Sequence, residues 1–151
     1  ELYNPNAFDI VMEPDLWTIG RTTSSSYTFT GPISIASGDH VVVGRNTAQA
    51  ASVGVTLVEA YGSGLLIPQA GTQDIYIEYD DPTAVTTVEV DVVDFEMDGT
   101  WSTIYAEGYS VELDRVGMGY PNDNNDVSNW CQATTQWSTG DYGTPGDPNG
   151  C

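Results

Sequence analysis

Two neighbouring stretches decide the fold class: Asp74-Ile75-Tyr76-Ile77-Glu78-Tyr79 and Val88-Glu89-Val90-Asp91-Val92-Val93. Along both stretches, apolar residues recur at every second position and most of the residues between them are polar or acidic. Successive side chains of a β-strand point to opposite faces, so this period predicts strands with one apolar and one wet face. The turn signal Asp80-Asp81-Pro82 lies between the two stretches and separates them into two strands.

Further short strands are predicted on both sides of this pair. They cover Leu16–Ile19, Tyr27–Phe29, Ile33–Ile35, Val41–Val43, Thr56–Ala60 and Tyr109–Leu113. In the last of these, the alternation predicts Glu112 on the wet face. Only Thr47–Val53 has the composition of a helical turn or two. Many short strands with turn signals between them are typical of an all-β sandwich.

The length and composition of the chain favour one domain with a different character at its end. A chain of 151 residues is long enough for one core and short for two. Residues 1–116 carry the strand patterns, whereas residues 117–151 are rich in Gly, Pro and Asn. We therefore expect a β-sandwich core over 1–116 and a loop-rich C-terminal segment over 117–151 that packs on the same domain.

The charge of the chain excludes several classes of partner. It has 22 acidic residues against three arginines and no lysine, for a net charge of −19. Such a chain repels phosphate backbones and anionic membrane surfaces, so neither nucleic acid nor a membrane surface is an expected partner. No apolar run approaches the ~20 residues that a membrane helix needs. Scattered acids are typical of a soluble protein in a salty or extracellular setting.

Cys131 and Cys151 are the two cysteines, and both lie in the Gly- and Pro-rich C-terminal segment. Their placement predicts a disulfide that holds this segment down, and hence an oxidising compartment. The alternative is two unrelated thiols. A zinc site is disfavoured because the single histidine, His40, belongs to a distant predicted strand.

The motifs of common enzymes are absent from the sequence. His40 precedes a valine run as the first residue of a strand, and no Gly-x-Ser-x-Gly motif accompanies it. Carboxylates occur in pairs throughout, but in a chain this acidic their pairing does not single out a site. We therefore expect no catalytic residues, and a hydrolase with a carboxylate-held metal ion is the least favoured alternative.

Calcium is the best candidate among small ligands, because hard cations bind several oxygens at once. Asp123, Asn125 and Asp126 offer such oxygens within one short loop, and Asp80-Asp81 offers another pair. The alternative for both loops is ordinary Asx-turn hydrogen bonding. Carbohydrate is a second possible ligand. Its candidate platforms are the aromatic residues expected on wet faces or in loops, namely Tyr61, Tyr76, Trp101, Tyr105, Trp137 and Tyr142.

An ordered set of motifs runs through nearly the whole chain. It comprises Glu1-Leu2-Tyr3-Asn4-Pro5, Trp17, Tyr27-Thr28-Phe29, His40-Val41-Val42-Val43-Gly44, Gly108-Tyr109-Ser110-Val111-Glu112-Leu113, Asn129-Trp130-Cys131 and Gly143-Thr144-Pro145-Gly146-Asp147-Pro148-Asn149. In this order the motifs resemble the lamin-tail domain, a family found in nuclear lamins and in secreted bacterial and archaeal proteins. The resemblance implies an immunoglobulin-like β-sandwich with Trp17 and Trp130 in its core.

The resemblance also implies a non-catalytic structural or interaction module on the outside of a cell. Lamin-tail domains usually open with a strand ahead of the Glu1–Pro5 motif, and that strand is absent from this sequence. We therefore expect an open sheet edge near Leu2. Either the sequence is a fragment of a longer polypeptide that carries the missing strand, or a strand from another chain fills the edge. Head-to-tail strand donation would build filaments. The alternatives are a carbohydrate- or calcium-binding module.

Overall fold

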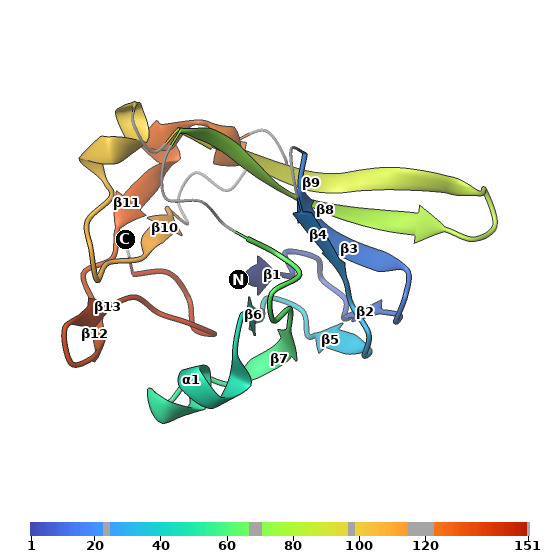
Figure 1. Cartoon of the computed structure of the whole chain (residues 1–151), viewed down its shortest axis with the longest axis horizontal. Coiled ribbons are helices and arrows are strands. Elements are labelled where there is room, and N and C mark those ends of the chain that lie inside the picture. Colours follow the sequence, from blue (N-terminus) through green and yellow to red (C-terminus); the bar gives the residue numbers. More distant parts are fainter. Residues whose placement is uncertain (23–24, 67–70, 97–98, 115–122, 151) are drawn as a thin grey trace. The chain divides into compact units, whose positions relative to one another are not determined.

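The computed structural model describes residues 1–22, 25–66, 71–96, 99–114 and 123–150. These residues form short strands in several sheets, with a single α-helix, α1 (Thr47–Ser52), in the described part (Figure 1). The prediction of an all-β sandwich is therefore confirmed. None of the helices in these ranges is long and apolar enough to cross a membrane.

The chain divides into two compact units. Unit 1 comprises Glu1–Leu66, Tyr76–Asp91 and Pro145–Asp147, and unit 2 comprises Ile67–Ile75, Val92–Thr144 and Pro148–Cys151. The sequence predicts a change of character at Gly117, and unit 2 includes residues on both sides of that point, within Val92–Thr144. The strands β8 (Thr72–Asp81) and β9 (Thr86–Glu96) contribute residues to both units.

Unit 1 contains three sheets. The longest has the order β4-β3-β8-β9, in which β3 (Trp17–Arg21) pairs antiparallel with both β4 (Ser25–Thr28) and β8. A second sheet pairs β2 (Ile10–Met12) with β5 (Ile33–Ile35). The third has the order β1-β6-β7, from β1 (Leu2–Tyr3), β6 (His40–Gly44) and β7 (Leu57–Ala60).

The pair β6–β7 is parallel, so the chain needs a crossover between these two strands. Helix α1 supplies it, at the place where the sequence predicted a helical turn. Asn46 caps the helix because its side chain accepts a hydrogen bond from the Gln49 backbone N–H over 3.1 Å.

The core of unit 1 follows the predicted alternation. Ile33 and Ile35 are buried on either side of the exposed Ser34, and Phe29 is 1 % exposed. Met12, Ile19 and Leu65 are buried with them. Complete burial of one such apolar side chain stabilises a fold by roughly 1.5–3 kcal/mol.

Asn4 is a fully buried polar residue of unit 1, with none of its surface exposed. Its side-chain amide donates to the carbonyls of Phe8, Ile35 and Ala36 over 2.8, 2.9 and 3.2 Å. Its Oδ1 accepts from the Asn6 backbone N–H over 3.0 Å. Asn4 therefore joins the N-terminal segment to the end of β5 by side-chain hydrogen bonds.

Unit 2 is built from two short antiparallel pairs, 3-10 helices and an aromatic cluster. β10 (Val111–Leu113) pairs with β11 (Trp130–Gln132), and β12 (Gln136–Ser138) pairs with β13 (Asp141–Tyr142). The short helices are η1 (Thr100–Thr103), η3 (Asp123–Asn125) and η4 (Val127–Asn129). The ring of Trp101 lies 5.4 Å from that of Trp130 and 6.3 Å from that of Phe95.

Glu112 corrects one expectation from the sequence. Alternation predicted it on the wet face of its strand, but it is only 4 % exposed. Its carboxylate accepts hydrogen bonds from the Thr144 hydroxyl and the Gly150 backbone N–H over 2.9 and 2.8 Å. The C-terminal segment thus covers this face, which a pattern within one strand does not reveal.

Candidate functional site

The turn end of the β8–β9 hairpin is the strongest candidate for a functional surface. Every residue from 82 to 90 is exposed, although three of them are valines. Val85 is 89 % exposed, Val88 46 % and Val90 44 %. Apolar side chains that gather on one exposed element often mark a binding surface.

The turn itself has a defined and strained geometry. The Asp81 carboxylate accepts hydrogen bonds from the backbone N–H groups of Thr83 and Ala84 over 2.7 and 3.0 Å. Val85 follows with φ of 52°, in the left-handed region that a β-branched residue rarely adopts. Residues held in this region cluster at functional sites, where strain and function often coincide.

Hydrogen bonds determine which side of each strand faces its neighbour. The Asp80 N–H donates to the Leu16 carbonyl over 2.8 Å, so the even-numbered residues of β8 direct their backbone groups toward β3. β8 ends at Asp81 and β9 begins at Thr86, so counting back from the turn puts Thr87 opposite Asp80. The hydrogen bond from the Thr87 hydroxyl to the Asp80 carboxylate, over 2.6 Å, agrees with this count. Antiparallel counting from this pair places Val88 opposite Tyr79, Glu89 opposite Glu78, and Val90 opposite Ile77.

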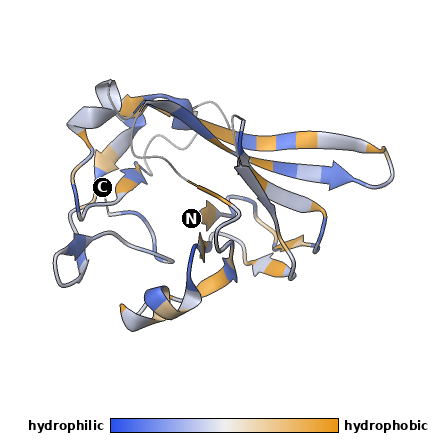
Figure 2. Ribbon diagram, viewed as in Figure 1, coloured by the Kyte–Doolittle hydropathy of each residue, from blue (hydrophilic) through white to orange (hydrophobic). Residues whose placement is uncertain are grey.

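The apolar face of the hairpin continues the apolar face of the sheet. Trp17 lies opposite Tyr79, and Ile19 lies opposite Ile77, so Val88 and Val90 extend these two rows. Figure 2 shows apolar and polar residues alternating along β8 and β9. Exposure rises along the row from 8 % at Ile19 to 44 % at Val90, so the apolar face is uncovered at its end.

The outer edge of β9 is open beside these valines. β9 is the last strand of its sheet in the described part of the chain. Because Val88 and Val90 direct their backbone groups toward β8, Thr87 and Glu89 direct theirs outward. The Thr86 hydroxyl donates to the Thr87 carbonyl over 3.5 Å. Farther along β9, the Asp94 N–H donates to the Asn125 side chain over 2.6 Å.

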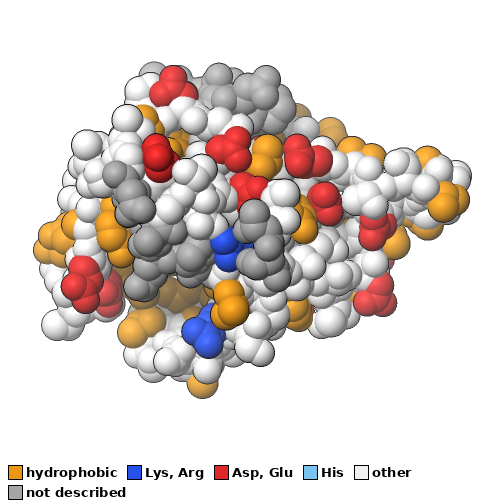
Figure 3. All heavy atoms as spheres, turned by 45° about the horizontal axis from the view of Figure 1, so that its top comes forward, with side chains coloured by type: hydrophobic (Ala, Val, Ile, Leu, Met, Phe, Trp, Pro, Cys, Tyr) orange, Lys and Arg blue, Asp and Glu red, His pale blue; other side chains and the backbone are white. Residues whose placement is uncertain are grey.

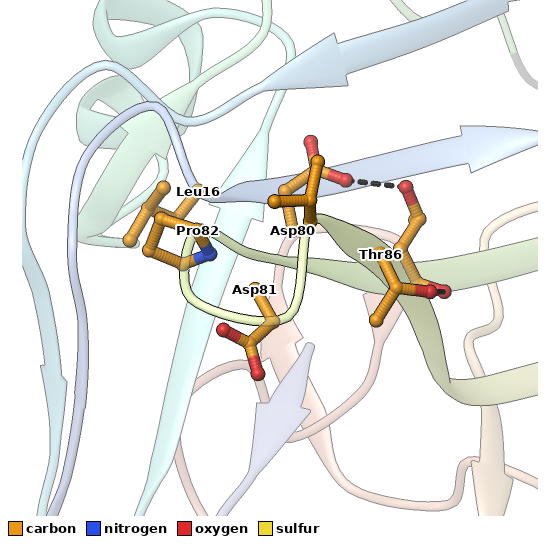
Figure 4. A pocket seen from close by; sticks show the side chains of 7 residues that line it. Leu16, Asp80, Asp81, Pro82 and Thr86 are labelled. Carbon is orange, nitrogen blue, oxygen red and sulfur yellow. Dashed lines mark hydrogen bonds between the residues drawn. The ribbon is translucent and has the colours of Figure 1, made fainter.

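A shallow pocket of about 350 Å³ adjoins this edge at the hairpin turn. Its lining residues are Leu16, Asp80, Asp81, Pro82, Val85, Thr86 and Thr87. Figure 4 shows their side chains around the turn, with the Asp80–Thr87 hydrogen bond dashed. The pocket combines apolar walls with two carboxylates, and Thr86 and Thr87 belong to both the pocket and the edge strand.

The hairpin is strongly acidic. Residues 76–91 include five acids, at 78, 80, 81, 89 and 91, and no Lys or Arg. Figure 3 shows acidic side chains spread over the visible face instead of gathered in one patch. By the same count along the hairpin, Glu89 is opposite Glu78, whose row also contains Thr18 and Thr28.

In the predicted calcium loop, one side-chain oxygen each of Asp126 and Asn125 accepts hydrogen bonds from the protein. Asp126 accepts from the backbone N–H and the hydroxyl of Ser128 over 2.9 and 2.8 Å, and these bonds lower the pKa of its carboxyl group. Asn125 accepts from the Asp94 backbone N–H. Asp123 begins η3, and its side chain lies outside the described residues. This arrangement fits the Asx-turn alternative, and calcium binding stays a prediction.

The predicted disulfide falls partly outside the described residues. Cys131 lies on β11, is half-buried and is not a free thiol. Cys151 is outside the described residues, so its pairing with Cys131 stays a prediction.

Trp17 and Trp130 are half-buried and not fully enclosed. Trp17 packs against Tyr79 with a ring separation of 5.0 Å. Trp130 packs against Trp101, and its indole N–H donates to the Asn124 carbonyl over 2.7 Å. Both rings contribute to packing within their own units.

The aromatic residues proposed for carbohydrate do not form an exposed strip. Trp101 is buried, which corrects its expected place on a wet face. Tyr142 stacks on Tyr109 at 4.4 Å. Of the six candidates, only Tyr105 is largely exposed, at 44 %.

His40 begins β6, as predicted, and stacks on Tyr3 with a ring separation of 4.5 Å. No group of three His, Cys, Asp or Glu side chains is placed to hold a metal ion within the described ranges.

The sheet edge near Leu2 is short. The Asn4 N–H donates to the Asp39 carbonyl over 3.0 Å, so Asn4 and Leu2 face β6 and only Tyr3 of β1 faces outward. Nearby, the Gly146 N–H donates to the Glu1 carboxylate over 2.7 Å. The edge of β9 is therefore a longer open edge than that of β1.

Sequence reasoning recognised the alternation in Val88-Glu89-Val90 but did not single out Val85, Thr87 or Glu89. The available signal was the stretch 86–96, which contains neither Pro nor Lys, the residues that commonly protect an edge strand. Comparisons with protein-family models, with curated proteins and with solved structures found no match to this chain.

Proposed function

We propose that this chain is a non-catalytic, extracellular interaction module of the lamin-tail type, which binds another polypeptide through the turn end of the β8–β9 hairpin. The observation that carries the proposal is the exposed apolar row of Val88 and Val90 beside an open strand edge. A solitary surface valine needs no explanation, whereas valines that continue a core row to an open edge form a contact surface.

The extracellular setting is supported by the charge and by the cysteines. A net charge of −19 without lysine suits a protein that stays dispersed at high salt. A disulfide between Cys131 and Cys151 would suit an oxidising compartment. The lamin-tail assignment is supported by the ordered motifs, among them Asn4, whose side chain holds the N-terminal segment in place.

The non-catalytic role is supported by how the polar groups are used. The histidine ring is stacked on Tyr3, and the carboxylates of Asp81 and Asp126 cap turns. The buried Glu112 binds the C-terminal segment. Each of these groups therefore has a structural role in the fold.

The proposal can be tested with a library of displayed peptides selected on the immobilised chain. Selected peptides would be synthesised, and their Kd measured for the wild type and for the double variant Val88→Thr/Val90→Thr. Threonine keeps the shape and the strand propensity of valine but removes apolar surface. We expect about a tenfold loss of affinity.

Val58→Thr is the matched control, because Val58 on β7 is 41 % exposed and lies outside the hairpin. It should leave the affinity unchanged. Equal binding by the wild type and the double variant, or an equal loss in the control, would contradict the proposal.

A further inference from the structure

We infer that the bound segment is an extended strand with alternating basic and apolar residues, which adds to the outer edge of β9 at Thr87 and Glu89. This inference rests on the proposed function and specifies the chemistry of the partner. It has three parts: backbone pairing, side-chain register and charge.

The backbone of β9 offers hydrogen-bonding groups to a partner strand. β9 is the last strand of its sheet in the described ranges, and the hairpin register directs the N–H and C=O groups of Thr87 and Glu89 away from β8. Proteins commonly protect such edges with Lys, Pro, a bulge or a very short strand. β9 is 11 residues long and has neither Lys nor Pro, so two of these protections against strand addition are absent from it.

The register determines which side chains of the partner lie where. A strand added beside β9 would continue the rows of its sheet. The rows Trp17–Tyr79–Val88 and Ile19–Ile77–Val90 would receive apolar side chains. The partner residue that pairs with Glu89 would place its side chain at the end of the row Thr28–Thr18–Glu78–Glu89.

The charge of that last row selects a basic residue. Glu78 and Glu89 are opposed carboxylates on neighbouring strands, and like charges in this position destabilise a sheet. A Lys or Arg at the next place in the row would relieve this repulsion. Asp80, exposed on the same face, adds to the negative field.

The same charge disfavours a second copy of this chain as the occupant. If β9 of one copy paired with β9 of another, the acidic row of each copy would lie beside that of the other. The chain has only three arginines and no lysine to offset this repulsion. The acids thus protect the edge against self-association and leave it open to a basic strand.

The inference can be tested with the full chain and three short peptides. The first is acetylated, amidated Lys-Val-Lys-Val-Lys-Val-Lys. The second replaces every Lys by Glu. The third has the first composition in the order Lys-Lys-Val-Val-Val-Lys-Lys. We expect binding of the first, no binding of the second and weaker binding of the third. Binding of the first should also weaken as NaCl rises from about 50 to about 500 mM.

Two variants separate the contribution of the Glu89 charge to peptide binding from that of the Glu89 backbone N–H. Glu89→Gln should weaken binding of the first peptide about two- to fivefold. Glu89→Pro removes an outward N–H but no bond to β8, so the fold should persist while binding is lost. Glu13→Gln removes one exposed acid outside the hairpin and should change nothing. Thermal unfolding checks that each variant is folded.

The outcomes distinguish this inference from the proposed function. Equal affinity for the Lys and Glu peptides, or unchanged binding by folded Glu89→Pro, would overturn the inference. If the inference failed but the selected peptides still lost affinity for the Val88→Thr/Val90→Thr variant, the proposed function would remain supported without the inference. Concentration-dependent dimers of the free chain, abolished by Glu89→Pro, would show a second copy as the occupant and would also overturn it.

Discussion

The hydroxyl of Thr87 donates a hydrogen bond to the carboxylate of Asp80 over 2.6 Å, across the turn end of the β8–β9 hairpin. With Thr87 opposite Asp80, the backbone groups of Val88 and Val90 point toward β8, and those of Thr87 and Glu89 point outward. The same register aligns Glu78 with Glu89. The open edge of β9 and the charge beside it therefore lie next to each other at this end of the sheet.

The strain at Val85 predicts that replacing it stabilises the fold. Val85→Gly removes a β-branched side chain from φ of 52°, and the side chain is 89 % exposed, so little packing is lost. We expect the free energy of unfolding to rise by about 1 kcal/mol. Urea denaturation measures this. Val88→Gly, at a regular strand position, should instead destabilise, and stabilisation by both variants would contradict the strain.

Asn4 is predicted to be the most sensitive polar position of unit 1. Asn4→Ala leaves the carbonyls of Phe8, Ile35 and Ala36 without this donor and opens a small cavity. We expect a loss of about 3 kcal/mol in the free energy of unfolding. Asn6→Ala removes bonds from an exposed residue and should cost less than about 1 kcal/mol. Equal losses in chemical denaturation would show that burial of Asn4 is unimportant.

The pair Tyr27–Glu59 predicts a pH-dependent contribution to stability. Burial would raise the pKa of Glu59, but hydrogen bonds from Tyr27 and Thr30 outweigh it, so the pKa is lowered. A carboxyl group whose pKa is lower in the folded state stabilises above its unfolded pKa of about 4.3, and the contribution disappears as the pH falls through the folded pKa. The pKa of Tyr27 is raised, chiefly by its hydrogen bond to Glu59 and secondly by burial.

Tyr27→Phe should therefore be less stable than the wild type by about 1 kcal/mol at pH 7, and this difference should shrink below about pH 4. Urea denaturation from pH 7 to pH 3 gives the two curves. Tyr61→Phe is the control. The pKa of Tyr61 is also raised, but the cause is burial and not a hydrogen bond to a carboxylate. A difference for Tyr27→Phe that does not vary with pH would contradict the coupling.

The pairing of Cys131 with Cys151 is predicted to hold the C-terminal segment. Intact mass with thiol alkylation, before and after reduction, tests it on protein from an oxidising source. We expect no alkylation before reduction and two labels after it. Reduction should lower the free energy of unfolding by roughly 3 kcal/mol, from the loop that the bond closes. Two labels before reduction would contradict the prediction.

The parts of the fold that depend on local pattern could be predicted from the sequence. Ile33 and Ile35 flank the exposed Ser34 as alternation requires, and β6 begins at His40. The buried faces of Glu112 and Trp101 could not be predicted. Their burial depends on distant segments that cover them, and a period of two within one strand carries no information about such cover.

The candidate site could be predicted only in part for the same reason. Alternation identified Val88, Glu89 and Val90 as a strand with two unlike faces. The sequence did not reveal that this strand is last in its sheet, because strand order depends on pairing with β8 and β3. The expected open edge near Leu2 came from a resemblance, whereas the open edge at β9 comes from the register.

The most direct measurement is amide hydrogen exchange of Thr87, Val88, Glu89 and Val90, with and without the Lys-Val peptide. In the free chain, the amides of Thr87 and Glu89 should exchange at least about tenfold faster than those of Val88 and Val90, which are bonded to β8. Saturating peptide should slow exchange at Thr87 and Glu89 to the rate of their neighbours. Protection of Thr87 and Glu89 in the free chain, or no change on adding peptide, would contradict strand addition at β9.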